Sequence, residues 1–206
     1  MAKVLIVNAS ARKERSLSRF MTNVFAETWK NKHPDDKISY REVGQAPVPH
    51  VTEAWIAGAF KPPALRTAED LEALKVSDEL VAELKETDVI VLGTPMYNWS
   101  VPSALKAYID QVLRVNETVL ISSDNPRNPY QGLLKDKKVY LLMARGNNGY
   151  DPGDFYEYMD FQTNYLKTVF RIMGIEDITD LAINGVGLVQ ESLDFATAKV
   201  AGLIRN

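Results

Sequence analysis

The chain of 206 residues predicts an α/β protein with one five-stranded parallel sheet and helices on both faces of that sheet. Short runs of consecutive aliphatic residues recur along it, as in Val4–Val7, and strands buried on both faces have this composition. The segments between the runs show the apolar spacing of amphipathic helices, as in Leu17–Trp29. Strand and helix alternate to the end of the chain, which is the pattern of a single parallel sheet.

Each of the five expected strands is short and is followed by a helical pattern, and aliphatic residues predominate in most of them. The strands are expected at Val4–Val7, Ile38–Val43, Asp88–Thr94, Val139–Met143 and Ile178–Ile183. Five strands connected in this way fit the order 2-1-3-4-5 of flavodoxin-like folds. Ligands of such sheets lie outside the carboxyl ends of the strands, at the switch point between the first and third strands.

The expected helices carry an apolar face, and proline or glycine marks the ends of several of them. Pro34 ends the helix that starts near Leu17, and Gly174 is a plausible C-cap for a later one. The other helices are expected at Glu53–Phe60, Ala68–Glu86, Pro102–Val115, Phe155–Met173 and Glu191–Ile204. Asn116–Asp136 reads as an irregular loop whose length suggests a functional or interface role. With no repeat and no boundary, residues 1–206 are expected to form a single domain.

Composition excludes several classes of function. With 24 Lys+Arg against 27 Asp+Glu, the chain has no basic excess for nucleic acid or anionic membranes. The absence of cysteine excludes disulfides and thiolate chemistry, and the two histidines show no metal-ligand spacing, so we expect no metal site. No apolar stretch approaches the roughly 20 residues of a membrane span, and the N-terminus does not read as a signal peptide, so a cytoplasmic location is expected.

The loop after the first strand offers hydroxyl groups at the start of a helix. Ser10, Ser16 and Ser18, together with the backbone amide of Leu17, could bind a phosphate there. The loop has neither a Gly-Lys-Ser/Thr ending nor a Gly-x-Gly-x-x-Gly pattern, which favours the single phosphate of a mononucleotide. The alternative is that the serines only cap the helix.

The loop after the third strand concentrates large side chains in a turn, namely Met96, Tyr97, Asn98 and Trp99. A flat ligand such as an isoalloxazine ring would explain them, because its faces favour aromatic and thioether contacts. The alternative is a loop that packs its own aromatic residues over the sheet edge.

The loop after the fourth strand, Ala144, Arg145, Gly146 and Asn147, permits close approach of the backbone to a ligand. Arg145 could place positive charge near the pyrimidine end of a flavin, although Arg-Gly-Asn is also ordinary turn chemistry. Three such loops, expected to meet at one sheet edge, together favour a site for a flavin-like mononucleotide over a purely structural role.

Several motifs in these loops and in the helices between them resemble the FMN-dependent NADH-azoreductases, a family that also reduces quinones. They are Lys3–Val7 with Ser10, Ser16–Ser18, Ser77–Leu80 leading to Asp88–Val91, Pro95–Trp99, Leu105–Asp110 and Arg145–Gly146. The resemblance implies a flavodoxin-like fold, non-covalently bound FMN, and a homodimer with its active site at the subunit interface. It also implies a ping-pong cycle from NADH or NADPH to a quinone or azo compound.

Carried over by position, the resemblance assigns the phosphate to Ser10 and Ser16–Ser18, the ring to Met96–Trp99 and the pyrimidine edge to Ala144–Asn147. We expect no catalytic side chain, since the chemistry belongs to the flavin. The hypothesis further predicts that Arg145→Ala slows flavin reduction and leaves the fold intact. The competing interpretations are a flavodoxin-type electron carrier without a small-molecule substrate and, less favoured, a phosphodiesterase or esterase on the same fold.

Overall fold

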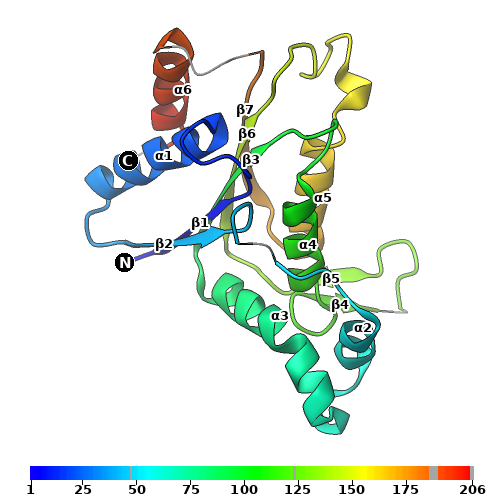
Figure 1. The fold of residues 1–206 in the computed structure, drawn as a ribbon. Helices are drawn as coiled ribbons and strands as arrows, with labels where there is room; N and C mark the ends of the chain where they lie inside the picture. Colours follow the sequence, from blue (N-terminus) through cyan, green and yellow to red (C-terminus); the bar gives the residue numbers. More distant parts are fainter. Residues whose placement is uncertain (47, 123, 186–189, 205–206) are drawn as a thin grey trace.

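A computed structural model describes residues 1–46, 48–122, 124–185 and 190–204. Its main sheet is parallel and has the strand order β2-β1-β3-β6-β7 (Figure 1). The strands are β1 (Lys3–Asn8), β2 (Lys37–Glu42), β3 (Val89–Pro95), β6 (Lys138–Ala144) and β7 (Asp177–Ile183). Counted among these five strands alone, the order is 2-1-3-4-5, so the predicted topology is confirmed.

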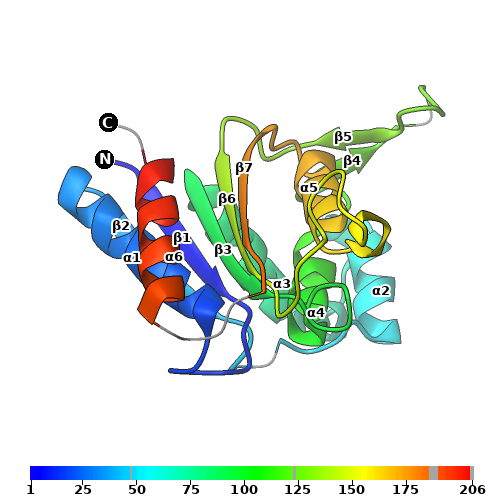
Figure 2. The same ribbon diagram turned by 90° about the horizontal axis from the view of Figure 1, so that it is seen from above.

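Helices cover both faces of this sheet, as Figure 2 shows from above. One face carries α1 (Leu17–Lys32) and α6 (Gln190–Leu203), and the other carries α3 (Ala68–Glu86), α4 (Ser103–Val112) and α5 (Thr163–Ile172). Alternate residues of β1 supply the two cores: Val4 and Ile6 pack with α1 and α6, whereas Leu5 and Val7 face α3, α4 and α5. No helix among the described residues is long and apolar enough to cross a membrane.

Local capping chemistry explains where several helices begin. The Oγ of Ser16 accepts from the N–H of Arg19 at the start of α1, and Thr52 caps α2 (Glu53–Phe60) in the same way. Thr67 and Asp70 form a reciprocal capping box at the start of α3. At the other end of α1, His33 is the C-cap and Pro34 follows it, in agreement with the predicted end of that helix.

The prediction of an irregular loop over Asn116–Asp136 is wrong in part, because the segment contains an antiparallel hairpin. Its strands are β4 (Val119–Ile121) and β5 (Tyr130–Gly132). The hairpin packs against the end of α5, where a Cβ on Gly132 would lie 2.0 Å from the backbone nitrogen of Gly174. Strands of three residues carry too little alternation for the sequence to reveal them.

The predicted helix Phe155–Met173 begins eight residues late. A 3₁₀ turn, Glu157–Met159, precedes it, and α5 starts at Thr163. The reason is a side-chain cap: one oxygen of the Asp160 carboxylate accepts from the backbone N–H groups of Gln162 and Thr163, at 3.1 and 2.9 Å. The predicted helix Pro102–Val115 is likewise shorter, ending at Val112.

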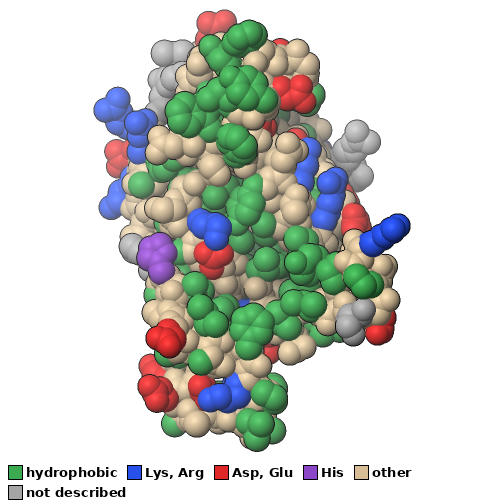
Figure 3. All heavy atoms as spheres, turned by 90° about the vertical axis from the view of Figure 1, so that its right-hand side faces the viewer, with side chains coloured by type: hydrophobic (Ala, Val, Ile, Leu, Met, Phe, Trp, Pro, Cys, Tyr) green, Lys and Arg blue, Asp and Glu red, His purple; other side chains and the backbone are tan. Residues whose placement is uncertain are grey.

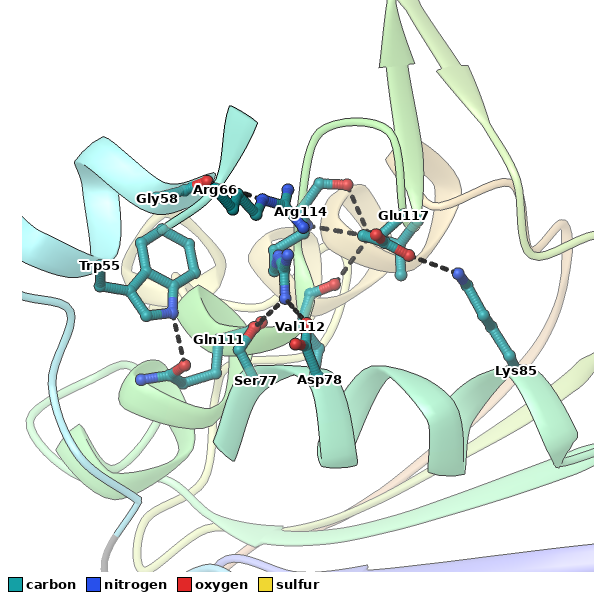
Figure 4. Close-up of polar contacts among 11 residues, drawn as sticks. Trp55, Gly58, Arg66, Ser77, Asp78, Lys85, Gln111, Val112, Arg114 and Glu117 are labelled. Atoms are coloured by element: carbon teal, nitrogen blue, oxygen red, sulfur yellow. Dashed lines mark hydrogen bonds and ion pairs between the residues drawn. The ribbon is translucent and has the colours of Figure 1, made fainter. Parts of the chain in front are cut away.

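A polar cluster fixes the carboxyl end of α4 to its neighbours (Figure 4). The indole N–H of Trp55 on α2 donates to Oε1 of Gln111 at 2.8 Å. The buried guanidinium of Arg114 donates to Oγ of Ser77 at 3.1 Å and also pairs with Asp78, both on α3. With this end tied to two helices, the amino end of α4, next to the loop after β3, is held in place.

Candidate functional site

Backbone hydrogen bonds join the three predicted loops at the carboxyl ends of β1, β3 and β6. The N–H of Ala9 donates to the carbonyl of Gly93 at 2.9 Å, and the N–H of Met96 donates to the carbonyl of Ala144 at 2.9 Å. The N–H of Gly185, after β7, donates to the carbonyl of Arg145 at 3.0 Å. The structure therefore brings the loops together at one sheet edge.

The first loop turns its serines inward at the start of α1. Ser10, Ser16 and Ser18 are all buried, and the Oγ atoms of Ser16 and Ser18 are 3.2 Å apart. Ser16 caps the helix, as the alternative interpretation held, but the first-turn N–H groups of Leu17 and Ser18 have no intrahelical acceptor. These donors and the helix dipole favour an anion.

Sequence reasoning did not include in the site three exposed cations of the same loop, Arg12, Lys13 and Arg15, which outnumber the exposed anion there, Glu14. Their position between a strand and a helix N-terminus was the available signal. They add positive charge beside the helix start, and a phosphate monoester fits this set of hydroxyl, amide and cationic groups.

The second loop is a strained turn that presents aromatic surface. Tyr97 and Ser100 exchange two backbone hydrogen bonds of 3.0 and 3.1 Å, with Asn98 at φ 48° and Trp99 at φ 65° between them. Positive φ at both central residues defines the type I′ geometry, which a Trp rarely adopts. Tyr97 and Trp99 are 37% and 46% exposed, so the loop does not bury its own aromatic residues.

Arg145 of the third loop is held inside the protein. Its side chain is 2% exposed, and its guanidinium lies 2.7 Å from the Asp160 carboxylate and 3.4 Å from that of Asp151. It also donates to Oγ1 of Thr163 at 2.5 Å. The expectation was that the guanidinium of Arg145 faces a flavin. In the structure its positive charge is paired with the carboxylates of Asp160 and Asp151.

The remaining third-loop residues are more accessible. Ala144 is half-buried at the end of β6, and Gly146 and Asn147 are exposed. The space around Gly146 is open, so its backbone can be approached closely.

Two amide side chains at this edge were missed by sequence reasoning. Gln162 is fully buried and donates from Nε2 to the carbonyl of Pro95 at 2.8 Å, while its Oε1 has no partner among the described residues. Asn184 donates to Asp151 at 2.7 Å, and its buried Oδ1 also lacks a partner within the described part of the chain. Such orphaned acceptors fit a ligand edge with N–H donors. Asn184 directly follows a strand, which was a usable signal, whereas nothing local marks Gln162.

Figure 3 shows the side of the molecule that lies at the right in Figure 1, where hydrophobic side chains gather. Two pockets share Tyr165 as a lining residue, and the first of them adjoins the second loop. One, of about 520 Å³, is lined by Tyr97, Asn98, Ser100, Val101, Ser103, Lys106 and Tyr165. The other, of about 430 Å³, is lined by Glu157, Tyr158, Asp160, Phe161, Asn164 and Tyr165. A further pocket of about 770 Å³ lies at the amino end of the sheet, between the β4–β5 hairpin and α5, away from the three loops.

The doubly wound sheet and its mononucleotide-type site define a flavodoxin-like protein. In agreement, the chain matches the family described as having a flavodoxin-like fold over residues 2–203. It is 45% identical to FMN-dependent NADH:quinone oxidoreductase 1 of Trichormus variabilis, covering 95% of this chain and 90% of the relative. It is 38% identical to FMN-dependent NAD(P)H:quinone oxidoreductase 1 of Pseudomonas aeruginosa, over 100% of both chains.

Solved structures agree with these relatives. The crystal structure of an FMN-dependent NADH-azoreductase from Bacillus anthracis in complex with FMN has a TM-score of 0.85 at 25% identity, covering 98% of this chain and 97% of that one. The chain belongs to the family of FMN-dependent NADH:quinone oxidoreductases and is an enzyme of that family.

Proposed function

We propose that this chain binds FMN non-covalently and passes electrons from NADH or NADPH to quinones and azo compounds by a ping-pong mechanism. The observation that carries the proposal is the meeting, at one sheet edge, of an anion-binding helix start and an exposed aromatic turn held at positive φ. Strain of this kind is found where a ligand contact requires it. The names of the relatives, FMN-dependent NADH:quinone oxidoreductases, agree with this chemistry.

Each loop has a distinct role in the proposal. Ser10 and the segment Ser16, Leu17 and Ser18 hold the phosphate through hydroxyl and amide donors. The segment Met96, Tyr97, Asn98 and Trp99 lines the ring, and Ala144, Arg145, Gly146 and Asn147 meet its pyrimidine edge through their backbone. The free acceptors of Gln162 and Asn184 receive N–H donors at that edge.

FMN, when bound at this site, would supply the redox chemistry, which is a two-electron transfer from the nicotinamide to the acceptor in two half-reactions. The protein's own residues bind the cofactor, orient the reactants and exclude water. Tyr97 lines the pocket of about 520 Å³ and Trp99 adds exposed aromatic surface in the same turn, and Arg145 holds the third loop through Asp160. No side chain is required as an acid, base or nucleophile.

A homodimer with the active site at its interface belongs to the same proposal. Phe155, Tyr158 and Phe161 are 80%, 73% and 61% exposed, and Tyr158 and Phe161 line the pocket of about 430 Å³. Large apolar side chains exposed together mark a surface that a partner covers. Sedimentation of the FMN-loaded protein tests this part, and a monomer at micromolar concentration contradicts it.

One experiment distinguishes the proposed oxidoreductase from the second candidate, an electron carrier without a small-molecule substrate. The protein is loaded with FMN, freed of unbound flavin and oxygen, and mixed with NADH while the visible absorbance is followed. Bleaching that a quinone reverses supports the oxidoreductase. Retained flavin that neither NADH nor NADPH bleaches supports the carrier, and loss of all flavin rejects the assignment of the three loops.

A further inference from the structure

Aromatic, hydroxyl and cationic side chains line the pocket of about 520 Å³ beside the second loop. Among its lining residues Lys106 is the cation, and no carboxylate is among them. Tyr97 and Tyr165 supply aromatic surface, and Ser100 and Ser103 supply hydroxyl groups. The pocket therefore suits an aromatic molecule that carries a negative group.

Within the part of the chain that the structure describes, the side chain of Lys106 is held by a surface ion pair. Its Nζ lies 2.6 and 2.8 Å from the two oxygens of Asp110, one helical turn further along α4. The two side chains are 51% and 34% exposed, so the pair contributes little and Lys106 can turn to an incoming anion.

Three carboxylates lie around the pocket, and one of them, Asp110, pairs directly with Lys106 and also acts on Tyr165. Glu157 and Asp160 line the neighbouring pocket beyond Tyr165, and Asp160 is paired with Arg145. Burial, and then the charge of Asp110, raise the pKa of Tyr165 to about 12. Its phenol therefore stays neutral and can donate a hydrogen bond.

We propose that Lys106 makes this enzyme select aromatic electron acceptors bearing an anionic substituent, such as a sulfonate or carboxylate, and that Asp110 moderates this preference. The inference rests on the proposed function, because it places the acceptor beside Tyr97 and Asn98 of the predicted flavin loop. Lys106 touches the acceptor's charged group and is a specificity residue.

Binding to the oxidised, FMN-loaded protein tests the proposal without turnover. Naphthalene-2-sulfonate and its neutral counterpart naphthalene-2-sulfonamide are titrated by calorimetry. Lys106→Met should weaken sulfonate binding roughly two- to fivefold and leave the sulfonamide unchanged. Asp110→Asn should have the opposite effect on the sulfonate. Lys3→Met is the matched control: Lys3 is 53% exposed and pairs with Glu86 at 3.2 Å, at the amino end of the sheet, and its loss should alter neither compound.

Kinetics provide the second readout. With 1,4-naphthoquinone-2-sulfonate as acceptor, Lys106→Met should raise KM by a similar factor, while KM for 2-methyl-1,4-naphthoquinone and the rate of flavin bleaching by NADH stay constant. Equal effects on charged and neutral compounds, or a weakened NADPH interaction in place of the acceptor effect, overturn the proposal. Failure of NADH to bleach the wild-type flavin instead rejects the proposed function, and the binding titration still decides the role of Lys106.

Discussion

Replacing Arg145 by methionine should destabilise the protein by several kcal/mol, because the change leaves a buried carboxylate without its partner. Asp160 is 10% exposed and lies 2.7 Å from the guanidinium. Breaking a buried pair from one side costs about 3–5 kcal/mol. Asp160 keeps its backbone donors at Gln162 and Thr163, which places the expected cost near the lower end, about 3 kcal/mol.

This loss is large against a total stability of roughly 5–15 kcal/mol. For a chain of this size, 1 kcal/mol corresponds to about 2–4 °C in Tm, so Arg145→Met should lower Tm by about 6–12 °C. Removing both charges, in Arg145→Met with Asp160→Asn, should recover most of the loss, since replacing a whole buried pair is often nearly neutral.

Urea unfolding of the FMN-free protein, followed by circular dichroism, measures both variants. Without FMN, the result reports the scaffold alone. An Arg145→Met variant that unfolds within about 1 kcal/mol of the wild type, yet whose flavin is reduced more slowly, would refute this reasoning. It would support the sequence-based prediction that Arg145→Ala slows flavin reduction and leaves the fold intact.

Three further predictions follow from local geometry. Trp99→Gly relieves the backbone strain at φ 65° and creates the Asn-Gly pair that type I′ turns favour. The FMN-free protein should therefore gain up to about 1 kcal/mol of stability in urea unfolding, while its affinity for FMN falls in a fluorescence titration. Lys61 and the backbone N–H of Thr67 lower the pKa of the Asp70 carboxyl to about 2, so the stabilisation of the fold by this carboxylate is complete above the pKa of Asp70 in the unfolded chain and is lost as pH falls toward 2. Asp70→Asn should therefore flatten the fall of the urea midpoint between about pH 4 and 2, and an unchanged slope contradicts this. Gly132→Ala places a Cβ 2.0 Å from the nitrogen of Gly174, so it should cost about 1–3 kcal/mol by thermal unfolding, whereas Gly146→Ala, in open space, should not.

Regular elements were predictable where the pattern was local. The aliphatic run Val4–Val7 and the run in β3 mark strands buried on both faces, and both lie within the strands of the structure. Ser16 at the start of α1 and Pro34 after its end were equally legible, because a cap acts within one turn of the helix. The positions of the three loops followed from strand order, since parallel strands end at one edge.

By itself, then, the sequence determined the sheet, its order and the edge where the site lies, through periodicities and caps that act over a few residues. Only the tertiary structure decided the partners of Arg145, the burial of Gln162 and the packing of the β4–β5 hairpin on α5. A guanidinium beside a loop can pair with a ligand or with a carboxylate. That choice depends on distances set by the packing of α5 against the sheet. Asp160, which precedes α5, lies 15 residues from Arg145 along the chain.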